Sequence, residues 1–173
     1  METVLFPIVL SLILVESILS GRWKRFYFEY GLPLFQKNIF LNESFLEVSI
    51  VVEKMNHKFK SSGYSPSLYF RAIDENTIAF REKMFELSLF TYTPLMHGRI
   101  SLSQNNQNIK ITGLSNWFPL AFLFLWYYSL LPNVSIQKDL IFLLAPILIF
   151  GVIYIIQRNK YQTLCTYLAD IKC

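Results

Sequence analysis

The chain has few side chains of the kinds that form active sites or hold metal ions. It contains two histidines, His57 and His97. His57 falls on the charged side of a predicted helix, where we expect it to be solvated. His97 stands with Gly98 and Arg99 in a predicted turn before a strand, and binding residues gather in such connections. His97 and Arg99 are therefore a candidate ligand-binding turn, although an ordinary turn without a ligand is the favoured interpretation.

The cysteines and glycines form no catalytic pattern. Cys165 and Cys173 lie near the C-terminus with no CxxC spacing and no neighbouring histidine, which favours free thiols in a reducing compartment. The glycines form no G-x-G-x-x-G, phosphate-loop or G-x-S-x-G pattern. We therefore expect a protein that is not an enzyme and holds no cofactor or metal. An enzyme acting on lipid would need His97 to meet carboxylates such as Glu82 or Glu86.

The composition indicates a chain that is partly embedded in lipid. Of its 173 residues, 53% are hydrophobic, and the mean hydropathy of +0.37 is high for a purely soluble protein. The net charge is +4, and the charged residues gather between 21 and 115, where both signs are mixed. Because a nucleic-acid-binding surface is more uniformly basic, we expect no nucleic-acid partner.

Two uncharged apolar runs dominate the C-terminal third of the chain. They cover 117–131 and 140–156, and the polar link 132–139 joins them. As helices, each would span about 25 Å or slightly less, against a hydrocarbon core of about 30 Å, and modest bilayer thinning closes that gap. A small domain could hardly cover both helices on all sides. A membrane hairpin is therefore favoured over two buried core helices.

A third apolar segment covers 1–19, and a basic cluster follows it at Arg22, Lys24 and Arg25. A cleaved secretory signal has its positive charge in front and a small residue before the cleavage site, whereas Ile18 occupies that place here. We therefore expect an uncleaved signal-anchor. Glu16 should reach the interface or pair with Arg22 or Lys24, the alternative being a proton carrier inside the membrane.

Basic residues set the expected orientation, because Lys and Arg beside membrane spans stay on the cytoplasmic side. The link 132–139 holds only Lys138, beside Asp139, so the opposite ends of the spans should be cytoplasmic. The residues that determine topology and can contact lipid headgroups are Arg22, Lys24, Arg25, Arg158 and Lys160. The expected protein spans the plasma (inner) membrane three times, with its N-terminus outside and its C-terminus in the cytoplasm.

The segment between the apolar runs begins with two short patterns. Residues 23–41 alternate aromatic and polar side chains, which predicts a strand and a short returning segment with Phe26 and Phe28 on one face. From a cap at Asn42 to a stop at Gly63, apolar side chains recur every three or four positions. This recurrence predicts an amphipathic helix, which we expect to pack on a sheet rather than on the membrane surface.

Two hairpins complete the predicted sheet. The first covers 67–88 with its turn at 74–77, and a third strand would begin near 87. The second joins 99–103 to 108–112 and would set Ile100 and Leu102 opposite Ile109 and Ile111. The middle segment is therefore predicted to be a small α+β domain with a mainly antiparallel sheet.

The predicted membrane hairpin has its own markers. Ser115 or Asn116 should cap its first helix and Asp139 its second, while Pro146 predicts a kink. Aromatic anchors are expected at both interfaces, namely Trp117, Trp126, Tyr127 and Tyr128. Beyond 156 a helical spacing continues through Tyr161, Leu164, Leu168 and Ile171, which predicts a tail that docks on the middle domain.

These patterns predict a membrane α+β protein in four parts: an N-terminal transmembrane anchor at 1–20, a cytoplasmic domain at 21–115, a transmembrane hairpin at 116–157 and a cytoplasmic helical tail at 158–173. The expected partners are the lipid bilayer and other membrane subunits or further copies of the chain. The leading functional hypothesis is a non-catalytic scaffold, regulatory or accessory subunit of a membrane complex. The alternative is a ligand-sensing effector that perturbs the membrane or forms a pore as an oligomer.

Overall fold

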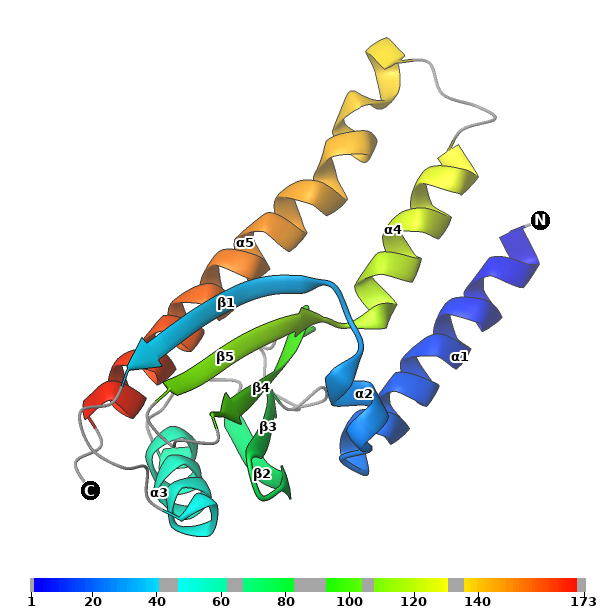
Figure 1. Ribbon diagram of the computed structural model, residues 1–173. Coiled ribbons are helices and arrows are strands. Elements are labelled where there is room, and N and C mark those ends of the chain that lie inside the picture. The colour runs from blue at the N-terminus through cyan, green and yellow to red at the C-terminus, as the bar shows by residue number, and fades with distance from the viewer. Residues whose placement is uncertain are drawn as a thin grey trace.

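The computed structural model describes residues 2–40, 47–61, 67–82, 93–103, 108–130 and 136–170, and it combines a five-stranded antiparallel sheet with helices. The helices are α1 (Glu2–Gly21), α2 (Arg25–Glu29), α3 (Val48–Ser61), α4 (Trp117–Leu130) and α5 (Ile136–Asp170) (Figure 1). The strands are β1 (Pro33–Phe40), β2 (Leu68–Asp74), β3 (Thr77–Glu82), β4 (Met96–Leu102) and β5 (Asn108–Ser115). The predicted α+β class with an antiparallel sheet is confirmed.

The sheet has the strand order β1-β5-β4-β3-β2. Both predicted hairpins are present, with Asp74 opposite Thr77 across the first turn. In the second hairpin, Ile100 pairs with Ile111 and Leu102 with Ile109, as predicted. Two further pairings complete the sheet. The first joins β3 to β4, and the second joins β1 to the outer edge of β5, which brings the first strand beside the last. The predicted third strand near 87 and the hairpin tip at 104–107 lie outside the described residues.

The prediction of a strand after Trp23 is wrong, because residues 25–29 form the short helix α2. Phe26 is 56% exposed and Phe28 is fully buried, so the two rings do not share a face. The neighbouring side chains Tyr27 and Phe28 are both buried, which a strand with alternating faces would not allow on one sheet surface. A five-residue segment is too short for its apolar spacing to separate a helix from a strand.

The turn between α1 and α2 is closed by a Schellman motif. Lys24 N donates to Leu19 O at 3.1 Å, and Trp23 N donates to Ser20 O at 3.1 Å. Trp23 therefore occupies the left-handed position that glycine usually takes, with φ of 54°. Its ring stacks on Phe28 at 5.4 Å and lies 4.9 Å from the guanidinium carbon of Arg81. These ring contacts offset the backbone strain and fix α2 beneath the end of α1.

The amphipathic helix α3 packs on the sheet, which confirms the predicted partner of its apolar face. Its buried side chains are Val51, Met55 and Phe59. Asn56 also bonds to the edge strand β2: its Nδ2 donates to Phe70 O and its Oδ1 accepts from Phe70 N, both at 2.9 Å. The expected cap at Asn42 and stop at Gly63 lie outside the described residues.

The C-terminal half of α5 covers the same sheet face as α3. Tyr161, Leu164 and Leu168 are fully buried there, which confirms that the helical tail docks on the domain; Ile171 is outside the described residues. A pair of facing glycines, Gly98 on β4 and Gly113 on β5, makes room for aromatic rings. A Cβ on Gly98 would overlap the Phe80 ring, and a Cβ on Gly113 would lie 2.8 Å from the Tyr161 ring.

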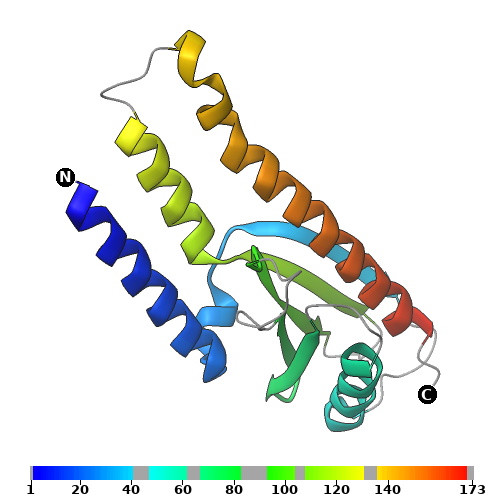
Figure 2. The same ribbon diagram turned by 180° about the vertical axis from the view of Figure 1, so that it is seen from behind.

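The first half of α5 leaves the domain beside α1 and α4. Figures 1 and 2 both show these three helices side by side and projecting from the same end of the domain. Among the described residues, only α5 is long and apolar enough to qualify as a candidate membrane span, and α1 and α4 contribute shorter apolar helices. The helix α5 begins at Ile136, so Asp139 lies inside its first turn rather than at its cap, and it continues through Pro146.

Candidate functional site

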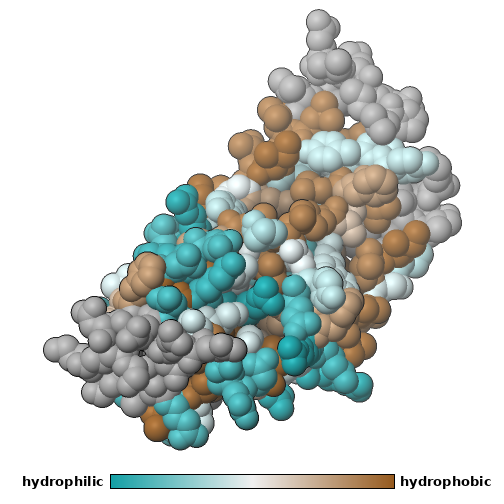
Figure 3. Space-filling model, in the orientation of Figure 1, coloured by the Kyte–Doolittle hydropathy of each residue, from teal (hydrophilic) through white to brown (hydrophobic). Residues whose placement is uncertain are grey.

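The helices α1 and α4 and the first half of α5 together form an apolar surface, which we call the helix layer. Figure 3 shows hydrophobic residues gathered over these helices and hydrophilic residues over the domain at the other end of the molecule. Among the large apolar side chains that α5 leaves exposed are Ile141, Phe142, Ile147, Leu148, Ile149, Val152 and Ile155. The helices α1 and α4 add Ile8, Leu10, Leu14, Val15, Ile18, Leu120 and Phe124. A patch of this extent indicates a surface that is covered by lipid or by another protein.

Beneath the helix layer, α1 is joined to α4 through Glu16. Its Oε1 accepts a hydrogen bond from Trp117 N and its Oε2 one from Phe118 N, each at 2.7 Å. Tyr27 Oη also donates to Glu16 Oε1, at 2.7 Å. The carboxylate therefore caps the first turn of α4, where unpaired N–H groups and the helix dipole favour a negative charge.

Asn116 and His97 continue this polar contact into the sheet. Asn116 Nδ2 donates to Pro94 O at 2.7 Å, which directs its Oδ1 toward His97 Nδ1, also at 2.7 Å. The other ring nitrogen, Nε2, lies 2.9 Å from Tyr27 O. We call Glu16, Tyr27, His97 and Asn116 the α1–α4 junction; all four are buried.

Burial shifts the pKa values of two side chains in the junction, His97 and Tyr27. It lowers the pKa of His97 to about 4, although the bonds to Asn116 and to Tyr27 O act in the opposite direction. A neutral imidazole has one N–H group. His97 therefore donates either to Asn116 Oδ1 or to Tyr27 O, but not to both. Burial also raises the pKa of Tyr27 above its ordinary range, with the Glu16 carboxylate as a further cause. The hydroxyl therefore remains a donor at every physiological pH.

The α1–α4 junction corrects three expectations, which concern Glu16, the cap of α4 and His97. Glu16 is only 1% exposed and bonds to the start of α4 rather than pairing with Arg22 or Lys24. The cap of α4 comes from this distant carboxylate, not from the side chains of Ser115 or Asn116. His97 lies within β4 and its ring is buried, so the predicted ligand-binding turn is a strand.

A second polar cluster, which we call the α5 junction, fixes α5 to the sheet. Gln157 Oε1 accepts from Leu95 N at 2.9 Å and from Met96 N at 3.1 Å. Gln157 Nε2 donates to Glu82 Oε2, and Lys160 Nζ lies 3.0 Å from Glu82 Oε1. Buried charges need such partners, because an isolated charge is costly to remove from water.

The basic residues that were expected to face lipid headgroups separate into two groups. Arg22, Lys24, Arg25 and Arg158 are exposed. Lys160 is instead 9% exposed and held by Glu82, so the expectation of a headgroup contact is corrected for this residue. Arg25 also pairs with Glu29 in the next turn of α2.

The expected aromatic anchors all lie on α4. Trp126 Nε1 donates to Phe142 O at 3.1 Å and Tyr127 Oη donates to Leu143 O at 2.7 Å, so both side chains join α4 to α5. Tyr128 is exposed, and Trp117 lies at the base of α4 with its ring 5.6 Å from that of Tyr27. The anchors near the far end of α4 thus also hold the two helices of the hairpin together.

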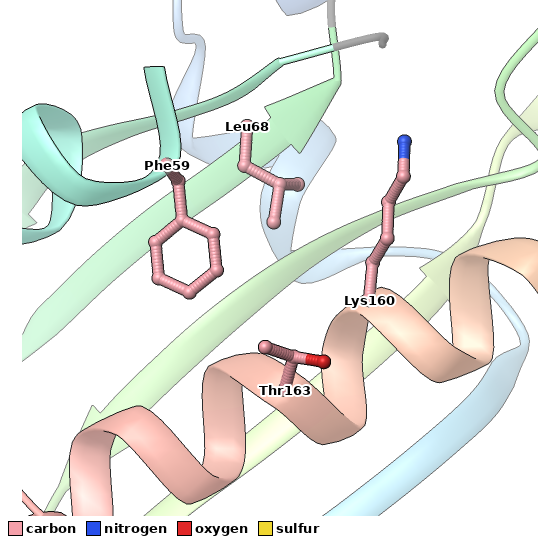
Figure 4. Close-up of a pocket in the computed structure, with 4 residues that line it drawn as sticks. All are labelled: Phe59, Leu68, Lys160 and Thr163. Carbon is pink, nitrogen blue, oxygen red and sulfur yellow. The ribbon is translucent and has the colours of Figure 1, made fainter. Parts of the chain in front are cut away.

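One small pocket lies between α3, β2 and α5, and Figure 4 shows its lining. Phe59, Leu68, Lys160 and Thr163 line it, and its free volume of about 10 Å³ matches about one water molecule. Arg99, the second residue of the expected ligand turn, is half-buried on β4, and its Nε is buried with no hydrogen-bond partner among the residues that the structure describes. Within the described ranges, no three His, Cys, Asp or Glu side chains are grouped as metal ligands.

Sequence reasoning missed both junctions. The signal that could have indicated the first is Glu16 itself, a carboxylate within an apolar segment, which needs a partner wherever that segment lies. Gln157, directly after the second apolar run, is a similar signal for the α5 junction. Their partners are distant in the chain, since Glu16 meets Trp117 and Gln157 meets Glu82.

Comparison of the chain with protein-family models, with curated proteins and with solved structures found no significant match.

Proposed function

We propose that this protein is a three-span membrane protein whose α+β domain is held against one face of the bilayer, where it serves as a non-catalytic scaffold, regulatory or accessory subunit. The observation that supports the proposal is the helix layer: α1, α4 and the first half of α5 project together from one end of the domain and expose large apolar side chains. Lipid is the solvent in which such a surface is stable without a further protein layer.

The lengths of the helices are compatible with this arrangement. The helix α4 has 14 described residues, or about 21 Å, and α5 from 136 to Tyr154 is about 28 Å long. The part of α1 before Glu16 lies beside α4 along its length, because Glu16 bonds to the first two residues of α4. A bilayer that thins locally around the shorter helices accommodates the set at a modest cost.

Charge favours a cytoplasmic domain. The exposed cations Arg22, Lys24 and Arg158 all lie at the domain end of the helices, whereas the link at the far end holds Lys138 beside Asp139. Positive residues near spans are retained in the cytoplasm. The proposed protein therefore has its N-terminus outside and its C-terminal helix on the cytoplasmic side of the plasma (inner) membrane.

A scaffold or accessory role is favoured over ligand sensing by the use of the polar side chains. The His97 ring is enclosed by Asn116 and Tyr27, and Glu82 is bound by Gln157 and Lys160. Both groups hold elements in place, and the pocket of Figure 4 has room for about one water molecule. A domain attached to the membrane at both of its ends is suited to holding a partner, or further copies of the chain, near the bilayer.

The proposal is tested by purifying the full chain from membranes in mild detergent and measuring the mass of the intact particle. A defined homo-oligomer or a stoichiometric complex with another membrane protein is the expected result. A monomer that elutes alone at every detergent concentration contradicts the scaffold role.

A further inference from the structure

The segment between α1 and the middle of β1 has a second apolar surface outside the helix layer. Phe26, Tyr30, Leu32 and Leu34 are between 39% and 58% exposed, although each is large and apolar or aromatic. The rings of Phe26 and Tyr30 lie 4.8 Å apart, so the surface is continuous at this point. Single exposed apolar residues are ordinary, but four within nine positions form a patch. We call these four residues the ledge.

The ledge lies at the level where the chain passes from the domain into the helices. The Phe26 ring is 5.9 Å from the ring of Trp117, the first residue of α4. Leu32 N donates to Ser115 Oγ at 3.1 Å, which ties the ledge to the residue at the end of β5. On the other side, Tyr154 Oη of α5 donates to Leu34 O at 3.1 Å. The ledge therefore connects the bases of two helices of the helix layer.

The side chains on and beside α2 fall into two groups. Tyr27 and Phe28 are buried against Ala79 and hold α2 on the domain. Phe26 and Tyr30 point away from that cluster and stay exposed. Arg22 and Lys24 are exposed immediately before α2, so cations border the apolar side chains. Aromatic and aliphatic side chains bordered by Lys and Arg are typical of segments that lie in a membrane interface.

We propose that the ledge lies in the interfacial layer of an anionic leaflet, with Phe26, Tyr30, Leu32 and Leu34 inserted between lipid headgroups and with Arg22 and Lys24 at the lipid phosphates. The inference rests on the proposed membrane insertion of the helix layer and adds a lipid class and a docking depth to it. An anionic leaflet attracts cations near its surface, which favours this placement of Arg22 and Lys24. The ledge thereby fixes the domain at a set height and tilt on the bilayer.

The depth of the ledge can be measured with nitroxide labels on the full chain. Single cysteines replace Leu32 in the ledge, Leu148 in the helix layer and Phe40 at the far end of β1, in a Cys173→Ser background; Cys165 is buried. Phe40 is the matched control, because it is on the same strand as Leu34 and is 79% exposed. Collision rates with oxygen and with a water-soluble nickel chelate are compared in vesicles of mixed zwitterionic and anionic phospholipid.

The expected result is a label at Leu148 that is accessible to oxygen only, a label at Phe40 that is accessible to nickel, and a label at Leu32 with a several-fold lower nickel collision rate than at Phe40. If Leu148 is in lipid while Leu32 and Phe40 are equally open to nickel, the ledge proposal is overturned and the membrane proposal stands. Low collision rates with both reagents at Leu32 would indicate a protein contact and would also overturn it. A nickel-accessible Leu148 overturns both proposals.

The role of Arg22 and Lys24 is tested with a separate double variant. Arg22→Gln with Lys24→Gln should raise nickel access at Leu32 in anionic vesicles to the level of purely zwitterionic vesicles. The label at Phe40 should be unchanged, which controls for loss of the domain fold. If the double variant leaves the Leu32 label as deep as in the parent chain, anionic headgroups do not hold the ledge.

Discussion

Glu16 is the residue on which the joint between α1 and α4 depends most directly. Replacing Glu16 by Ala removes the acceptor of two backbone N–H groups and of the Tyr27 hydroxyl. We expect the free energy of unfolding in detergent micelles to fall by about 2 to 3 kcal/mol, because buried donors lose a charged acceptor and a helix loses its cap. Denaturant titration of the full chain measures the change.

The matched control for this variant is Glu75→Ala. Glu75 is an exposed carboxylate in the turn between β2 and β3, so its removal should change the unfolding free energy by less than about 0.5 kcal/mol. Equal losses for the two variants would show that Glu16 has no special role in the joint.

His97 makes the stability of the domain depend on pH. Its pKa is about 4 in the folded protein and about 6.5 when unfolded, so the unfolded chain binds the proton more readily. The His97 contribution is complete above pH 6.5 and is lost as the pH falls toward 4, by about 3 kcal/mol in all. Unfolding curves between pH 7 and 4 measure it, and His97→Gln should flatten this part of the slope. A parallel slope in the variant contradicts the assignment.

At the residue scale, the sequence identified unusual side chains but not their partners. Glu16 was singled out because a carboxylate is out of place in an apolar run, yet its contact with Trp117 spans 101 positions along the chain. The neighbouring Gly98 and Arg99 suggested a turn at His97, which the structure places in β4. Gly98 instead serves packing, since the Phe80 ring occupies the space where a Cβ would be.

The connection between α1 and α2 depends on the left-handed backbone of Trp23. Trp23→Gly and Trp23→Ala both lose the ring contacts with Phe28 and Arg81, but only alanine keeps the backbone strain. The glycine variant should therefore be the more stable of the two by about 1 kcal/mol. Thermal unfolding of the pair measures the difference, and an alanine variant as stable as the glycine variant would contradict the Schellman geometry.

The packing of α5 on the sheet depends on the facing glycines Gly98 and Gly113. Gly98→Ala should destabilise the fold by about 1 to 3 kcal/mol, because the new methyl group overlaps the Phe80 ring. In a Phe80→Leu background the same substitution should cost less, since the ring is absent. Chemical denaturation of the four proteins in this cycle tests the coupling. A cost that is unaffected by Phe80→Leu would place the strain elsewhere.

At the element scale, local patterns predicted the segments with a clear period. The second hairpin has its expected partners, and α3 buries Val51, Met55 and Phe59 on the sheet. The helix α2 was not predicted, because five residues give too little periodicity. The turn before it was not predicted either, because Trp23 takes the left-handed backbone conformation that is expected only for glycine or asparagine.

At the scale of the whole molecule, the sequence separated the apolar segments from the charged middle but could not place them relative to one another. The order of the sheet depends on the pairing of β1 with β5, between Lys37 and Ile111 for example, which is a long-range contact. The two junctions and the ledge likewise join segments that are far apart in the chain. Such contacts form when distant segments pack together, and the local spacing of apolar residues carries no information about them.

If lipid covers the helix layer, the full chain should stay with sealed membrane vesicles during flotation, even after an alkaline carbonate wash. Carbonate removes proteins that are held by charge or by other proteins, whereas apolar helices inside the bilayer stay with the lipid. We predict that the chain floats with the vesicles, in the same fraction as an integral membrane protein used as a marker. Recovery of the folded chain in the aqueous supernatant would show that lipid does not cover the helix layer.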